Sequence, residues 1–120
     1  SYSDAVLAVV RAQAEPVIVV GHSFGGLVIS EAAESAPDRI ERLIYVAAYL
    51  PRSGDSLQSL SSEDHDNRFT QENFVVAADY STASVLARDA ALIFANDAHG
   101  RRQREIAEAL RPEPLSPMAT

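Results

Sequence analysis

The sequence of 120 residues contains no cysteine, which excludes disulfides and cysteine-ligated zinc sites. It also contains no apolar run close to the ~20 residues that a membrane-spanning helix requires. Basic residues are few: 10 Lys and Arg stand against 17 Asp and Glu, for a formal net charge of -7. An acidic chain repels phosphate backbones and offers no basic face to an anionic membrane. We therefore expect neither nucleic acid nor a membrane among its partners.

A signal peptide is also missing, because no charged segment followed by an apolar stretch begins the sequence. We therefore predict a cytoplasmic location. Residue 1 is a serine rather than an initiator methionine. For this reason we expect the true N-terminus to lie upstream and the sequence to be a fragment of a longer protein.

The most informative segment is Gly21–Gly25, which reads Gly-His-Ser-Phe-Gly and stands between the apolar stretches Val17–Val20 and Leu27–Ile29. A strand, a sharp turn with serine at its apex and a helix form the G-x-S-x-G nucleophile elbow. The serine hydroxyl of such an elbow is exposed above the sheet, which makes Ser23 the candidate catalytic residue. Glycines are expected where strand and helix run too close for a side chain. The elbow glycines are Gly21, Gly25 and Gly26.

The residues around this motif predict one βαβ unit. We expect a helix from Asp4 to about Gln13, a strand at Val17–Val20, a helix at Gly26–Ser35 and a strand at Leu43–Tyr49. The unbroken apolar run of the first strand is typical of a parallel strand buried on both faces. Two strands leave two open sheet edges, so we expect self-association through these edges.

After Leu50 the sequence becomes more polar and its pattern less regular. The expected segments are a polar stretch at Ser59–Thr70, a short strand at Phe74–Ala77, a helix at Val85–Asn96, and a helix that Asn96 or Asp97 caps and that runs to about Leu110.

These residues resemble the α/β-hydrolase superfamily, and within it a branch of small esterases and plant-type hydroxynitrile lyases. Val19–Gly26 is similar to the family's strand 5, elbow and following helix, and Ala36–Ala48 to its next turn and strand 6. Phe94–Asp97 and Leu110–Leu115 resemble the end of the helical cap of that branch. The resemblance implies an α/β fold: a partial α/β-hydrolase fold with one βαβ unit of a mostly parallel sheet and a mostly helical cap.

The resemblance also implies a division of the chain into three parts. Residues 1–50 would form a partial core with the nucleophile elbow, residues 51–115 a cap or lid, and residues 116–120 a tail that returns towards the core. The catalytic acid and histidine of the family, and one oxyanion donor, would lie outside these 120 residues. We therefore expect the parent protein to be an enzyme and the 120-residue chain alone to be inactive.

The resemblance assigns roles to individual residues. Ser23 would be the nucleophile, and the backbone N–H of Phe24 one oxyanion-hole donor. Tyr49, Leu50 and Phe94 are candidates for the substrate pocket. The implied chemistry needs neither a cofactor nor a metal.

Several other polar residues have a structural interpretation as well as a catalytic one. His22 precedes the serine and is interpreted as a packing residue. His65 and His99 are alternative bases, and Asp55 is an alternative acid, but each is more simply a polar surface or loop residue. Asp64-His65-Asp66 does not predict a metal site, because three adjacent residues cannot all face one ion.

The function expected of the parent protein is hydrolysis of small carboxylic esters through a serine nucleophile and an acyl-enzyme. One alternative is cleavage of cyanohydrins, as in hydroxynitrile lyases, with Ser23 in an acid–base role. A second alternative is a non-catalytic ligand-binding protein on a hydrolase scaffold. The expected partner is a small ester-like molecule.

Overall fold

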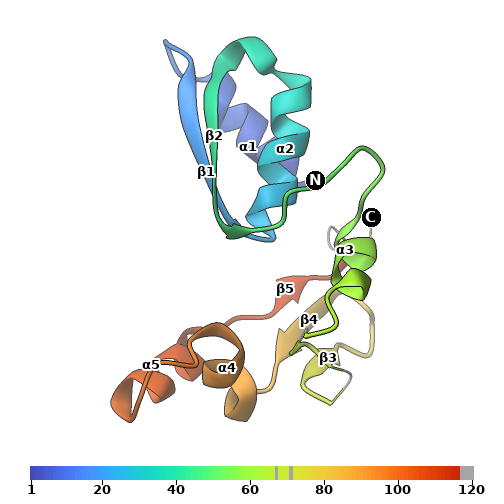
Figure 1. The fold of residues 1–120 in the computed structure, drawn as a ribbon, viewed down its shortest axis with the longest axis vertical. Helices are drawn as coiled ribbons and strands as arrows, with labels where there is room; N and C mark the ends of the chain where they lie inside the picture. Colours follow the sequence, from blue (N-terminus) through green and yellow to red (C-terminus); the bar gives the residue numbers. More distant parts are fainter. Residues whose placement is uncertain (67, 71, 117–120) are drawn as a thin grey trace. The chain divides into compact units, whose positions relative to one another are not determined.

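The computed structural model describes residues 1–66, 68–70 and 72–116. The chain forms two compact units, one of residues 1–63 and one that begins at Asp64 (Figure 1). Within the described ranges every helix is too short or too polar to span a bilayer.

The first unit contains the predicted βαβ arrangement. Its elements are helix α1 (Tyr2–Arg11), strand β1 (Val17–Ser23), helix α2 (Gly25–Ser35), a 3-10 turn (Pro37–Arg39), strand β2 (Ile40–Ala48) and helix α3 (Leu57–Glu63). Strands β1 and β2 pair in parallel, with Gly21 opposite Tyr45 and Ser23 opposite Ala48. Helix α2 connects the two strands and packs against both of them.

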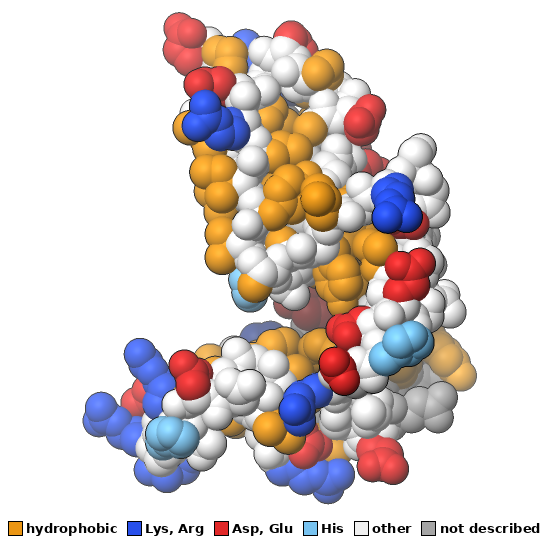
Figure 2. All heavy atoms as spheres, in the orientation of Figure 1, with side chains coloured by type: hydrophobic (Ala, Val, Ile, Leu, Met, Phe, Trp, Pro, Cys, Tyr) orange, Lys and Arg blue, Asp and Glu red, His pale blue; other side chains and the backbone are white. Residues whose placement is uncertain are grey.

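Only one face of this sheet is covered by described residues. Helix α1 packs on α2, and both helices lie on the same side of the strands (Figure 1). Val17 and Val19 of β1 are accordingly half-buried. The opposite face, along the left edge of the unit in Figure 2, carries the exposed side chains of Ile18, Val20, Ile44 and Val46. The prediction that Val17–Val20 is buried on both faces is therefore wrong for the described structure.

The core of the first unit lies between α1 and α2. Leu7 of α1 is buried together with Ala32 and Ala36 of α2. Alanine side chains are small, so the two helices can approach closely. On the side of α2 that faces the sheet, Ile29 is buried and its Cδ1 atom lies beside Gly21. This packing holds α2 against the end of β1, where the candidate site lies.

Helix α1 begins earlier than its predicted start at Asp4. Ser1 is the N-cap: its Oγ accepts the Asp4 N–H at 3.2 Å, and the Asp4 side chain reaches back to the Ser1 backbone. In this capping box an acidic residue occupies the first turn rather than the cap. The sequence prediction therefore began the helix two residues late.

The second unit combines a small sheet with two helices. Strands β3 (Phe74–Val76), β4 (Thr82–Val85) and β5 (Glu113–Pro114) pair antiparallel in the order β3-β4-β5. Helix α4 (Ala87–Phe94) follows β4, and helix α5 (Arg101–Ala109) packs against α4. The predicted short strand at Phe74–Ala77 is confirmed as β3.

Several predicted boundaries in this part of the chain are wrong. The expected helix at Val85–Asn96 is shorter, because Leu86 has an extended backbone that separates β4 from α4. The N-cap of α5 is Gly100, with a φ of 56°, rather than Asn96 or Asp97. The sequence analysis missed α3, β4 and β5: α3 is rich in serine, and the two strands form through pairing with distant segments.

Among its described residues, the predicted segment 51–115 thus contains three short helices and a three-stranded antiparallel sheet. The boundary between the compact units falls after Glu63, inside this segment. The assignment of residues 1–50 to a core and 51–115 to a cap stays a prediction. Most of the predicted tail, residues 117–120, lies outside the described residues.

Candidate active site

Ser23 is the last residue of β1, and its backbone has a φ of 54°. Residues with a side chain rarely adopt positive φ, so this turn is strained. The serine is exposed, and α2 begins two residues later at Gly25. Strand, strained serine and helix follow one another as the nucleophile elbow requires.

At two of the three elbow glycines, neighbouring backbone lies too close for a side chain to fit. A Cβ atom on Gly21 would lie 2.8 Å from the backbone oxygen of Gly25, and one on Gly26 would lie 1.9 Å from the backbone oxygen of Tyr49. At Gly25 a Cβ atom would meet nothing within 4 Å. The steric explanation therefore holds for Gly21 and Gly26, and it is wrong for Gly25 among the described residues.

The end of β2 holds the elbow from the neighbouring strand. The Tyr49 N–H donates to the Ser23 carbonyl oxygen at 3.1 Å. The Tyr49 backbone also lies directly against Gly26 in the first turn of α2. One residue after β2 therefore contacts the backbone on both sides of the turn.

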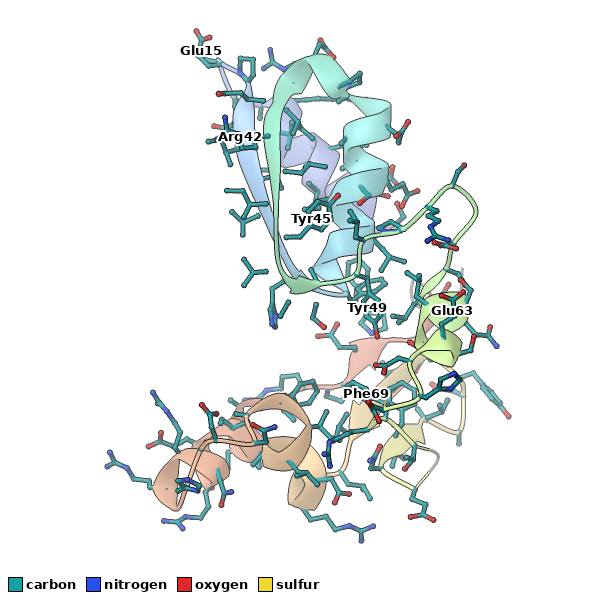
Figure 3. All side chains as sticks on the ribbon, in the orientation of Figure 1. Glu15, Arg42, Tyr45, Tyr49, Glu63 and Phe69 are labelled. Atoms are coloured by element: carbon teal, nitrogen blue, oxygen red, sulfur yellow. The ribbon has the colours of Figure 1, made fainter. Side chains whose placement is uncertain are left out.

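A hydroxyl pair, which the sequence analysis missed, connects α2 to β2. Ser30 Oγ donates to the Gly26 carbonyl at 2.7 Å and lies 2.7 Å from the Tyr45 hydroxyl. Because Ser30 has one hydroxyl hydrogen, the Tyr45 O–H donates to Ser30 Oγ. Figure 3 labels Tyr45 on β2, with its side chain on the α2 side of the strand. The only signal in the sequence is a serine four residues after Gly26, a spacing that allows such a bond.

Phe24 is the N-cap of α2. The first N–H groups of a helix have no acceptor within it, and they form the positive end of its dipole. The Phe24 N–H thus belongs to the positive end of the α2 dipole, next to Ser23 in the chain. The Phe24 ring contacts the Tyr2 ring edge-on, with 5.7 Å between the ring centres. This contact links the turn at Ser23 to helix α1.

His22 is exposed, so its interpretation as a packing residue is wrong for the described structure. Alternate residues of a strand share one face, and His22 shares the face of Ile18 and Val20, which no described helix covers. Ser23 follows it directly, and its left-handed backbone interrupts the alternation of side chains along β1. The strand geometry therefore does not assign His22 as the base for Ser23.

Among the alternative acids and bases, Asp55 is engaged locally: its Oδ2 accepts the Arg52 N–H at 2.7 Å. This contact agrees with the interpretation of Asp55 as a polar loop residue. His65 and His99 are exposed and belong to the second unit. Asp64 Oδ1 accepts the Asp66 N–H at 3.1 Å, and the described residues contain no group of three or more potential metal ligands.

The candidate pocket residues fall in both units. In the first unit Tyr49 is half-buried, with its hydroxyl 3.3 Å from Ser61 Oγ, and Leu50 is 69% exposed. In the second unit Phe94 is 49% exposed, and its ring centre lies 5.7 Å from that of Phe69. A pocket shared by these residues stays a prediction.

Comparison with known proteins identifies the family. A model of the alpha/beta hydrolase family matches residues 1–119, and the chain belongs to this family. It is 46% identical over 46 residues, which are 38% of this chain and 19% of the relative, to the carbendazim hydrolyzing esterase of Nocardioides sp. (strain SG-4G). It is 39% identical over 54 residues, which are 45% of this chain and 21% of the relative, to methyl jasmonate esterase 1 of Vitis vinifera.

A solved structure agrees with these relatives. The extracellular alpha/beta-hydrolase from a Paenibacillus species superposes with a TM-score of 0.65 and 27% identity, over 97% of this chain and 48% of that protein. The chain therefore spans about half the length of this structure, and the aligned segments cover about a fifth of the two curated relatives. The predicted superfamily, its esterase branch and the partial α/β-hydrolase fold are confirmed.

Proposed function

We propose that Ser23 is the nucleophile of a carboxylic ester hydrolase. The observation that carries this proposal is the strained, exposed serine between β1 and α2, with φ at 54° and a helix N-terminus beside it. A backbone strained in this way costs about 1–3 kcal/mol, and such residues cluster at active sites. Membership of the alpha/beta hydrolase family supports the proposal.

In the proposed reaction, Ser23 Oγ bonds to the ester carbonyl carbon while its proton passes to a base. The carbonyl oxygen becomes an oxyanion and accepts the Phe24 N–H. The bond to the alcohol then breaks, the base returns the proton to the alcohol, and an acyl-Ser23 ester remains. Water then adds to the acyl carbon and gives a proton to the same base. The bond between the acyl carbon and Ser23 Oγ breaks, the base returns the proton to Oγ, and the carboxylic acid leaves.

We assign the base and its acid partner to none of the 120 residues. His22 is exposed on the face of the sheet that no described helix covers, and His65 and His99 are exposed residues of the second unit. Losing the base of such a triad lowers turnover by about 10⁶. The 120-residue chain alone is therefore expected to turn over esters at close to the background rate.

The proposed substrates are small carboxylic esters, methyl esters first among them. The names of the relatives support this choice, because two of them are a methyl jasmonate esterase and a methylesterase. No observation on the described residues favours cyanohydrin cleavage or a non-catalytic role. Self-association through the sheet edges and a cytoplasmic location stay predictions.

The test is labelling of the complete gene product with a fluorophosphonate, which reacts covalently with activated serines. The wild-type protein should be labelled once per chain, and Ser23→Ala should not be labelled. Ser62→Ala is the matched control, since it removes an exposed hydroxyl that bonds within α3 and should leave labelling stoichiometry intact. Equal labelling of wild type and Ser23→Ala would falsify the nucleophile role.

A further inference from the structure

Strand β2 contains a register shift directly opposite the elbow. His22 pairs with Val46 and Ser23 pairs with Ala48, so Ala47 has no partner on β1. Ala47 has a φ of 42°, and glycine is the usual residue at a left-handed position in a β-bulge. Among the described residues, three non-glycine residues have positive φ, and two of them, Ser23 and Ala47, lie side by side on paired strands.

The extra residue determines where the chain leaves β2. Side chains and N–H groups alternate along a strand, so inserting one residue reverses the direction of each group that follows. Beyond the bulge, the Tyr49 N–H reaches the Ser23 carbonyl at 3.1 Å. The Tyr49 backbone also lies against Gly26, where no Cβ atom could fit. Figure 3 shows Tyr49 at the end of β2.

We propose that the Ala47 bulge positions the catalytic elbow. It places Tyr49, and Tyr49 holds both the Ser23 carbonyl and the first turn of α2, which carries the Phe24 N–H. The bulge thereby sets the position of the Ser23 hydroxyl relative to its oxyanion donor. Ala47 is exposed and acts through Tyr49, so it is a positioning residue. This inference rests on the proposed role of Ser23 as nucleophile.

The test compares Ala47→Gly with Ala47→Val in the complete gene product. Glycine adopts positive φ freely, whereas a β-branched residue is an outlier there. Ala47→Gly should keep the fluorophosphonate labelling rate and kcat within about 2-fold of wild type. Ala47→Val should lower both by about 10- to 100-fold, because misplacing a catalytic group by about 1 Å costs up to about 10²-fold. KM should change by less than about 2-fold, since the bulge orients catalytic groups rather than holding substrate.

Tyr80 supplies a matched control for backbone strain. It has a φ of 57°, is 76% exposed and lies in the second unit, in the turn between β3 and β4. Tyr80→Gly and Tyr80→Val repeat the two exchanges at a strained position in the other unit. Both should leave the labelling rate within about 2-fold of wild type.

The outcomes separate this inference from the proposed function. Folded Ala47→Val with the wild-type labelling rate overturns the positioning role alone. Wild-type protein that is not labelled removes the nucleophile role and this inference with it. If Ala47→Val does not fold, Ala47→Asn and Ala47→Gln carry the test, because asparagine adopts positive φ several-fold more readily than other side-chain-bearing residues. The Asn variant should react at least about 5-fold faster than the Gln variant, and equal rates overturn the inference.

Discussion

Replacing Gly26 by alanine would place a methyl group in the space that the Tyr49 backbone occupies. The new Cβ atom would lie 1.9 Å from the Tyr49 oxygen, 2.9 Å from its carbonyl carbon and 3.0 Å from its nitrogen. Carbon and oxygen atoms pack at about 3.5 Å, so the two segments would have to separate by about 1.5 Å. The backbone at Tyr49, directly after β2, can move aside less easily than the end of a flexible side chain.

The expected loss of stability follows from three contributions. Overpacking costs about 1–3 kcal/mol. The separation also stretches the 3.1 Å bond from the Tyr49 N–H to the Ser23 carbonyl, and the loss of such a bond costs about 1 kcal/mol. Alanine stabilises a helix by about 1 kcal/mol relative to glycine, and this gain offsets the cost of the lost hydrogen bond. We therefore expect Gly26→Ala to lower the free energy of unfolding by about 2 kcal/mol.

Gly25→Ala is the matched control, because it makes the same exchange one residue earlier, where a Cβ atom meets nothing within 4 Å. Its free energy of unfolding should equal that of wild type or exceed it by up to about 1 kcal/mol. Urea unfolding followed by circular dichroism measures both variants. Equal midpoints for Gly25→Ala and Gly26→Ala would show that the contact between α2 and Tyr49 does not constrain the elbow.

The remaining predictions concern hydrogen bonds elsewhere in the chain. Tyr45→Phe and Ser30→Ala should each lower the free energy of unfolding by about 1 kcal/mol. The double variant should lose less stability than the sum of the two, because both substitutions remove the same contact between hydroxyl groups. Additive losses would mean that this contact contributes nothing to stability. The Ser81 side chain and N–H hold the pKa of Asp79 below its ordinary 3.8. Since the folded-state pKa is depressed, the stabilisation is present above the unfolded pKa and is lost as pH falls through the folded value. Carbon-detected NMR titration should find the Asp79 pKa higher in Ser81→Ala than in wild type, and identical titrations would contradict the assignment of the shift to Ser81.

The sequence predicts the elbow well because its signals are local. An apolar run, a G-x-S-x-G pentapeptide and a helix rich in small residues lie within Val17–Ser35, and β1 and α2 form there. The second unit was predicted less well, since β4 and β5 depend on partners far along the chain. Glu113–Pro114 offers no strand signal of its own, because proline cannot donate to a ladder and is tolerated only at an edge.

Side-chain environment was harder to predict than secondary structure. His22 follows the apolar run Val17–Val20, which predicts a buried strand. The His22 side chain is nevertheless exposed, because both helices cover the opposite face of the sheet. Nothing in the order of the residues states which face a helix will cover. The left-handed backbone of Ala47 is similarly invisible, since alanine has no preference for positive φ. Its conformation follows from the register between β1 and β2, which is a property of the pair.

The geometry of the elbow is therefore not a property of the pentapeptide alone. Left-handed backbone at Ser23 and Ala47 costs about 1–2 kcal/mol at each residue, and neither would keep it in an isolated peptide. The contacts that oppose this cost come from β2 and its exit: the Tyr49 N–H on the Ser23 carbonyl, and the Tyr45 hydroxyl on Ser30. A G-x-S-x-G motif without such a neighbouring strand has the residues of a nucleophile elbow but not its strain. Searches for elbows should accordingly weigh the strand that follows the helix as much as the motif itself.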